Sequence, residues 1–363
     1  MAGRTAAGIL PAHHISELIA AGRIRLARKA DADQIQPASL DLRLGRTAYR
    51  VRASFLPGPG LTVAERLKSL SLHEIDLTAS AVLETGCVYI VPLLERLALP
   101  DDVAAAANPK SSTGRLDIFT RVITDRAREF DIIPPGYQGP LYLEVSPRTF
   151  PIVVRAGSRL TQIRFRRGSA RLDDAALTSL HRRTPLVDRD LHVANGLVLS
   201  IDLTGSRGIV GYRAKRHTGL VDVDKRDAHE VLDFWEPIAR HGVDELVLDP
   251  DQFYILASRE AVQVPPDYAA EMVPFDPLVG EFRVHYAGFF DPGFGHSPAG
   301  GAGSRAVLEV RSHEIPFILE HGQIVGRLVY ERMIERPEVL YGQGIGSHYQ
   351  AQGLKLSKHF RAG

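Results

Sequence analysis

The feature that most constrains this chain is an internal repeat, because a repeat with a long period determines the architecture before any single segment is considered. Several landmarks of the first half return in the second half in the same order and with the same spacing. They are Tyr89, Glu95, Pro100, residues 143–145 (LEV), Pro151 and Gly157, which recur as Tyr254, Glu260, Pro265, residues 308–310 (LEV), Pro316 and Gly322. Two related domains are therefore expected, at residues 1–170 and 196–363, with residues 171–195 as a polar, partly helical linker.

Two shorter matches extend the repeat. Residues 39–42 (SLDL) return as residues 200–203 (SIDL), and each match is soon followed by a glycine. Residues 100–114 match residues 266–280 after a slip of one position. The alternative is that short β-proteins share turn residues by accident, and the nearly constant spacing argues against it.

Apolar segments in this chain are short and end in turn residues. Examples are residues 88–92 (VYIVP), 141–145 (LYLEV) and 152–154 (IVV), and the chain holds 32 glycines and 23 prolines. Such runs predict a mostly β sandwich or barrel in each domain. Helical periodicity is confined to a few segments, namely residues 15–21, 173–181 and 227–240.

Composition excludes several classes of protein. A formal net charge of +1 gives no strong field for a nucleic-acid backbone or a membrane surface. The short basic run at residues 164–167 (RFRR) is interpreted as an exposed strand end. The single cysteine excludes an internal disulfide framework and indicates a reducing compartment. Since no long apolar run and no signal peptide are found, a cytoplasmic protein without a membrane span is expected.

Residues 108–116 (NPKSSTGRL) form the sharpest polar motif of the first domain. Glycine allows close approach of the backbone, hydroxyl and amide groups donate hydrogen bonds, and arginine pairs with oxyanions in a bidentate way. The motif therefore predicts a phosphate-binding loop, although it lacks the Walker pattern GxxxxGK[ST]. A solvated turn with a capping serine is the alternative.

Glu144 lies within an apolar strand pattern. Alternation places Leu141, Leu143 and Val145 on one face, and Glu144 on the other face with Tyr142. The pattern leaves two interpretations open. Glu144 is either an outward, solvated residue or a carboxylate in a cleft that acts as a general base.

Three segments in this order resemble the dCTP deaminase family: residues 35–45 (IQPASLDLRLG), the loop at 108–116, and the YLEV strand with the proline and glycine that follow it. The family has a trimeric dUTPase-like β-fold. The resemblance therefore implies a mainly β chain with two tandem dUTPase-like (β-clip type) barrel domains, a few short helices, and a trimer-based homo-oligomer. The second half resembles the family more weakly, in a pyrimidine-pocket hairpin at 285–294, a strand at 306–310, and a C-terminal segment that contains Tyr341, Tyr349 and Gln352.

The resemblance also implies roles for single residues. Glu144 would be the general base that activates water, and Ser111 would place that water. Arg115 would pair with the carboxylate or with a phosphate. The substrate-binding residues implied are Lys110 and Ser112 for the phosphates, the backbone from Val122 to Thr124 with Arg126 nearby for the pyrimidine edge, and Tyr341 and Gln352 for the triphosphate or sugar.

The chain departs from the family at several of these positions. Lysine stands at 110, where the family usually has arginine, and residues 121–124 read RVIT in place of HVTA. In the second domain, Asp276 and Glu281 would repel a triphosphate, whereas Glu309 remains. Two hypotheses follow. Either the first domain keeps the whole site, or one composite site joins its loop to the carboxylate and tail of the second domain. We take Glu144 as the expected base and Glu309 as the alternative.

The chemistry implied is hydrolysis of dCTP to dUTP and ammonia without zinc, which would supply dUTP for thymidylate synthesis. One cysteine and the absence of an HExxH motif leave no zinc-deaminase or zincin site. A carboxylate would activate water, and magnesium would only organise the triphosphate. A bifunctional dCTP deaminase and dUTP diphosphatase is the nearest alternative, and a non-catalytic nucleotide-binding regulator is another.

Overall fold

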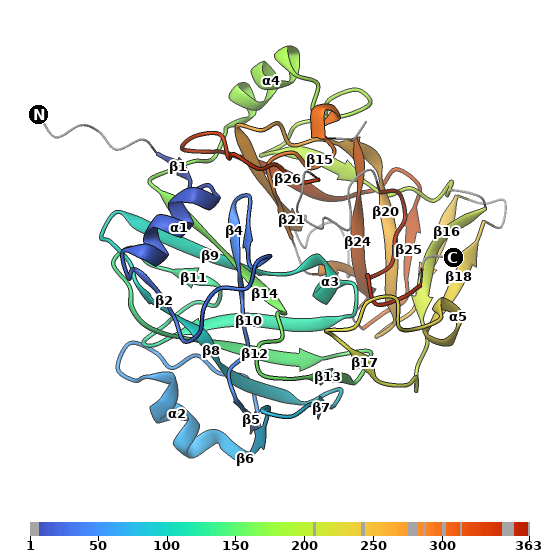
Figure 1. Ribbon diagram of the computed structural model, residues 1–363. Coiled ribbons are helices and arrows are strands. Elements are labelled where there is room, and N and C mark those ends of the chain that lie inside the picture. Colours follow the sequence, from blue (N-terminus) through green and yellow to red (C-terminus); the bar gives the residue numbers. More distant parts are fainter. Residues whose placement is uncertain are drawn as a thin grey trace, which may run out of the picture.

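The computed structural model describes residues 7–205, 208–240, 244–274, 282–285, 288–299, 303–312, 314–342 and 352–361. The chain is mainly β, as the short apolar runs predict, and its strands fall into two groups that follow one another in sequence. Figure 1 shows the two halves packed side by side, the first in blue to green and the second in yellow to red, with helix α3 near their boundary.

Two large sheets build most of the first half. One has the strand order β11-β9-β14-β4-β3, with β1 on β14, and the other has the order β10-β12-β8-β5-β6, with β2 on β8; β7 pairs with β13. The strands are β1 (Gly8–Ile9), β2 (Ile24–Leu26), β3 (Ile35–Gln36), β4 (Ser39–Leu42), β5 (Thr47–Val51), β6 (Ser71–Asp76), β7 (Ala81–Leu83), β8 (Val88–Ala98), β9 (Val103–Pro109), β10 (Ile118–Thr124), β11 (Ile132–Ile133), β12 (Gln138–Pro147), β13 (Ile152–Val154) and β14 (Thr161–Arg167).

The second half repeats this arrangement. Its sheets have the orders β15-β26-β21-β23 and β18-β16-β20-β24-β22, and β19 pairs with β25. The strands are β15 (Leu197–Ser200), β16 (Ile209–Ala214), β17 (Val221–Asp222), β18 (Trp235–Ala239), β19 (Glu245–Leu248), β20 (Phe253–Val262), β21 (Tyr268–Pro274), β22 (Phe282–His285), β23 (Phe289–Phe290), β24 (Ser304–Ser312), β25 (Phe317–Glu320) and β26 (Ile324–Arg332).

The correspondence between the halves extends to strand register. Tyr89 in β8 lies opposite Val145 in β12, and Tyr254 in β20 lies opposite Val310 in β24. Each tyrosine hydroxyl also accepts a backbone N–H from five residues upstream, at 3.0 Å in the first half and 2.9 Å in the second. The repeat seen in the sequence is therefore present in strand order and in local hydrogen bonding.

One of the short sequence matches is wrong in register. Leu42 in β4 lies opposite Thr161 in β14, and at the corresponding place in the second half Leu199 in β15 lies opposite Gly326 in β26. The sequence match had paired Leu42 with Leu203, which is four positions too far along the chain. The likeness of SLDL to SIDL therefore does not identify the corresponding residues. The pairing of backbone hydrogen bonds between neighbouring strands identifies them.

The slip of one position is also wrong where the structure tests it. Pro109 at the end of β9 lies opposite Thr161, and Pro274 at the end of β21 lies opposite Gly326, so β9 and β21 correspond without a slip. Residues 275–281, which contain Asp276 and Glu281, lie outside the described residues.

Two of the three expected helices are confirmed, as α1 (Ala12–Ala20) and α4 (Asp174–Arg183). The helix expected over residues 227–240 is wrong, since that stretch holds only the single turn α5 (Val231–Phe234) before strand β18 begins. Pairing of β18 with β16 and burial of Trp235 outweigh the helical periodicity. The other helices are α2 (Val63–Leu70) and α3 (Ser111–Gly114).

A continuous interface joins the halves. The second half sends β17 to pair in parallel with β13 of the first, and Trp235 packs edge-on to Phe150 at 5.4 Å. Arg164 in β14 is only 2% exposed and donates to Asp291 of the second half at 3.0 Å, so the expected exposed strand end at this residue is wrong. No helix among the described residues is long and apolar enough to cross a membrane.

Candidate active site

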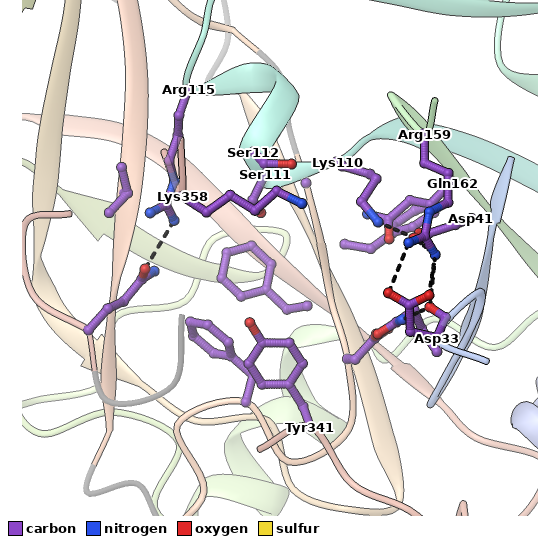
Figure 2. Close-up of a pocket in the computed structure, with 18 of the residues that line it drawn as sticks. Asp33, Asp41, Lys110, Ser111, Ser112, Arg115, Arg159, Gln162, Tyr341 and Lys358 are labelled. Carbon is purple, nitrogen blue, oxygen red and sulfur yellow. Dashed lines mark hydrogen bonds and ion pairs between the residues drawn. The ribbon is translucent and has the colours of Figure 1, made fainter. Parts of the chain in front are cut away.

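A cavity of about 230 Å³ lies where the two halves meet. The loop after β9 supplies Lys110, Ser111, Ser112 and Arg115 to its wall, and the second half supplies residues of β23, β24 and the C-terminal segment. Figure 2 shows the labelled loop residues on one side of the cavity and Tyr341 on the other. The cavity therefore brings together segments that lie far apart in the sequence.

Local geometry explains how the loop is formed. Strand β9 ends at Pro109, Lys110 has an extended backbone, and the chain then turns into the one-turn helix α3. The Lys110 carbonyl accepts the backbone N–H groups of Thr113 and Gly114 at 2.8 and 3.0 Å. Ser112 is buried, so a freely solvated turn does not describe this loop.

Carboxylates hold the lysine and a neighbouring arginine at the cavity. Lys110 forms an ion pair with Asp41 of β4, and Arg159 donates two hydrogen bonds to Asp33 at 2.9 and 2.8 Å. Figure 2 shows these pairs together on the side of the cavity away from Arg115. Asp33, Asp41 and Arg159 were not singled out from the sequence, although Asp41 lies inside the IQPASLDLRLG motif.

Glu309 faces the loop from the second half. It lies in β24 between Leu308 and Val310, which are buried in the core of that half, so its side chain emerges on the other face of the strand. Its Oε1 atom is 4.0 Å from Nε of Arg115. Burial raises the pKa of the Glu309 carboxyl to about 8, and the charge of Arg115 opposes that shift. A carboxyl with a pKa near neutrality is suited to taking up and releasing protons in a reaction.

The C-terminal segment closes over the loop. Arg115 donates to the Lys355 carbonyl at 2.9 Å and to Oε1 of Gln352 at 3.1 Å. The Ser357 hydroxyl donates to the Ser112 carbonyl at 2.8 Å. The tail therefore fixes the orientation of the arginine that faces Glu309. Tyr349 lies outside the described residues.

Glu144 occupies the corresponding strand position in the first half but a different environment. It lies opposite Arg121 in the ladder, as Glu309 lies opposite His285. Glu144 is 1% exposed, so the interpretation as a solvated residue is wrong. Arg121 donates to its Oε1 atom from two nitrogens, at 3.0 and 2.7 Å. The Arg121 guanidinium also covers the Phe130 ring at 3.5 Å, so a cation and an aromatic ring fill the space beside this carboxylate.

The structure thus divides the residues predicted from the sequence. Seven line the cavity, namely Lys110, Ser111, Ser112, Arg115, Glu309, Tyr341 and Gln352. Four do not, namely Glu144, Val122, Thr124 and Arg126. Val122 instead donates its backbone N–H to Asp131 at 2.7 Å. Lining residues that sequence reasoning missed include Arg226, Asp291 and Lys358; of these, Asp291 lies within the hairpin at 285–294.

A basic loop rich in hydroxyl groups, a buried carboxyl and a closing tail around one cavity define an enzyme-like site for a small anionic substrate. Two family models match the chain and cover almost all of it. The 2'-deoxycytidine 5'-triphosphate deaminase (DCD) N-terminal domain matches residues 6–169, and the C-terminal domain of the same family matches residues 173–360. The chain belongs to the dCTP deaminase family, and the resemblance seen in its motifs is confirmed.

Individual relatives agree with this assignment. A crystal structure of 2'-deoxycytidine 5'-triphosphate deaminase from Agrobacterium tumefaciens is 67% identical, covers 92% of this chain and 100% of its own, and has a TM-score of 0.88. The "dCTP deaminase, dUMP-forming" of Kocuria rhizophila is 33% identical over 145 residues, which is 40% of this chain and 71% of that protein. The dCTP deaminase of Halorubrum lacusprofundi is 29% identical over 160 residues, or 43% of this chain and 76% of that protein.

Proposed function

We propose that this chain hydrolyses dCTP to dUTP and ammonia in one composite site between its two halves. The observation that carries the proposal is the meeting of Arg115 from the first half with the buried Glu309 from the second, beside a loop suited to phosphate. Each half alone lacks part of this arrangement. The geometry favours Glu309 over Glu144 as the base, because Glu144 is engaged by Arg121 and does not line the cavity.

In the proposed mechanism, ionised Glu309 takes a proton from water while the water oxygen bonds to C4 of cytosine. Ser111 and Arg115 orient the water and stabilise the charge that develops. The tetrahedral intermediate receives the proton on its exocyclic nitrogen, the C4–N bond breaks, and ammonia leaves. Ser112 and Lys110 bind phosphates, and Tyr341 and Gln352 close the site from the tail.

Magnesium is proposed as a counterion of the triphosphate. Asp33 and Asp41 at the cavity are paired with Arg159 and Lys110, so the metal would be held mainly through phosphate oxygens. Removing Mg²⁺ with EDTA should then raise KM for dCTP and leave the folded protein intact. Loss of the fold in EDTA would contradict this role.

Several finer features of the resemblance belong to the same proposal. Each half is proposed to be a dUTPase-like β-clip barrel, with Val122, Thr124 and Arg126 belonging to a diverged pyrimidine pocket in the first half. A trimer-based assembly and a cytoplasmic location are also proposed. Sedimentation of the purified chain measures the assembly directly.

The test is incubation of the purified protein with dCTP and Mg²⁺, followed by separation of nucleotides and assay of ammonia and pyrophosphate. Stoichiometric dUTP and ammonia are expected. The dUMP-forming relatives favour a second candidate, a bifunctional enzyme, for which dUMP and pyrophosphate would be the products. Binding of dCTP without turnover would instead indicate a nucleotide-binding regulator.

A further inference from the structure

The cations near the reacting groups are already engaged. Lys110 is paired with Asp41, Arg159 with Asp33, and Arg115 is held by the tail and faces Glu309. A nucleoside triphosphate brings more negative charge than a monophosphate, and that charge lies at the end of the phosphate chain. Positive charge in addition to these pairs would favour binding of that end of the chain.

Arg226 is suited to supply it. It lines the same cavity and is exposed, and it forms no ion pair with the described residues. It comes from residues 221–229 of the second half, which we call the crossover segment because it begins with β17 and crosses onto the first half. Neither composition nor spacing pointed to this residue.

The crossover segment is held by backbone and side-chain contacts on its first-half side. Val221 pairs with Ile152 of β13. Arg155 donates to Asp222 at 2.7 Å, and the Ser158 hydroxyl donates to Asp224 at 2.6 Å. These contacts place the backbone immediately before Arg226.

The same segment is held to the tail on its other side. The Asp227 N–H donates to the Lys358 carbonyl at 3.0 Å, and the Ala228 N–H donates to the His359 carbonyl at 3.0 Å. Nε2 of His359 is 3.0 Å from the Val223 carbonyl. The backbone on both sides of Arg226 is therefore held in place, next to that of Lys358.

Three cations, Lys110, Arg226 and Lys358, line this cavity. Burial, together with the charges of Lys110 and Arg226, lowers the pKa of Lys358 to about 8. The charge of Arg226 acts on Lys358, whereas Arg115 is the charged side chain that acts on the pKa of Glu309. An anion placed among these three cations would relieve their mutual repulsion.

We propose that Arg226 binds the terminal phosphate of the substrate and makes this enzyme prefer a deoxycytidine triphosphate to the monophosphate. The inference rests on the proposed deamination of dCTP. It assigns the choice of phosphate number to the crossover segment of the second half, whereas Ser112 of the loop binds the phosphates nearer the sugar.

The test compares Arg226→Gln with Lys225→Gln as a matched control. Lys225 is the adjacent residue, its side chain is 69% exposed, and it does not line the cavity. In Arg226→Gln, kcat/KM for dCTP should fall about tenfold or more through KM, since a charged hydrogen bond contributes roughly 1.5–3 kcal/mol. The value for dCMP should be unchanged, and Lys225→Gln should match the wild type with both substrates.

An equal loss for dCTP and dCMP, or no loss for either, would overturn the assignment. If the wild-type protein binds dCTP without turnover, the proposed function fails, and calorimetric binding of dCTP and dCMP to the same variants takes its place as the readout. A selective weakening of dCTP binding would still support Arg226, and equal affinities of variant and wild type would reject it.

Discussion

Two glutamates at corresponding strand positions have different surroundings, and single side chains account for the difference. Arg121 engages Glu144 with two hydrogen bonds, whereas Arg115 approaches Glu309 only to 4.0 Å and leaves it facing the cavity. The same residue type at the same register therefore serves as an ion-pair partner in one half and as the proposed base in the other.

Substitution of each glutamate separates the two roles. Glu309→Gln should lower kcat for dCTP by about a hundredfold or more, because glutamine keeps the shape and cannot accept the proton. Glu144→Gln should keep kcat within a few-fold of the wild type while lowering stability, because Arg121 loses a charged partner. Steady-state kinetics and thermal unfolding of both variants measure these effects. The reverse pattern would return the catalytic role to Glu144.

The pH dependence of kcat/KM should be bell-shaped with a maximum near pH 8. The pKa of Glu309 is raised to about 8, so the ionised base becomes more abundant as pH rises toward that value. The pKa of Lys358 is lowered to about 8, so above it a cation near the phosphates is lost. Lys358→Arg should move the descending limb to higher pH and leave the ascending limb in place. A pH-independent profile between 6 and 10 would contradict both assignments.

The free energy of unfolding should also depend on pH through Glu309. Since the folded pKa of Glu309 lies above its ordinary value of 4.5, its protonated form is favoured by folding. The contribution of Glu309 to the free energy of unfolding is fully present below about pH 4.5 and is lost as pH rises through 8. Glu309→Gln should therefore raise Tm relative to the wild type at pH 9 and have less effect at pH 5, in scanning calorimetry of the two proteins.

At the scale of elements, the tail and the crossover segment complete the wall of a cavity to which both halves contribute. Residues 352–361 fasten to the loop through Gln352 and Ser357 and to the crossover segment through Lys358 and His359. Each contact joins segments more than a hundred residues apart. Sequence motifs identified the loop at 110–115 and Gln352 but not the contacts between them.

Gln352→Ala tests the tail as an orienting element. Removing this hydrogen-bond partner of Arg115 should raise KM for dCTP several-fold and change kcat less. The expected loss of binding free energy is about the 0.5–1.5 kcal/mol of an ordinary hydrogen bond or more. Gln252→Ala is the matched control, since Gln252 bonds to the Ala214 carbonyl and does not line the cavity. Equal kinetics for the two variants would show that the tail contact is dispensable.

At the scale of the whole molecule, buried ion pairs hold the halves in the arrangement that forms the cavity. Arg311 of β24 pairs with Asp117 of the first half, and both side chains are almost fully buried. The same arginine bonds to the Thr149 hydroxyl at 3.0 Å. This pair lies two residues along β24 from Glu309, so it also positions the strand that carries the proposed base.

Breaking that pair should be costly. Arg311→Met should lower the free energy of unfolding by about 3–5 kcal/mol, because it removes the cation that pairs with the buried Asp117 carboxylate. Adding Asp117→Asn should recover part of the loss. Arg213→Met removes an exposed pair with Glu236 and should cost about 1 kcal/mol or less in the same urea titrations. Equal costs for the two single variants would contradict the structural role of Arg311.

The sequence by itself determined the mainly β class, the duplication, two of the helices and the family, because these depend on local alternation, turn residues and motif spacing. It also identified the loop at 110–115 and both candidate glutamates. Tertiary structure alone decided the register of residues 39–42, the strand that replaces a helix near Trp235, and which of Glu144 and Glu309 lines the cavity. The physical reason is that these outcomes depend on contacts across the two halves: which backbone completes a ladder, which cation reaches a carboxylate, and which groups line a cavity.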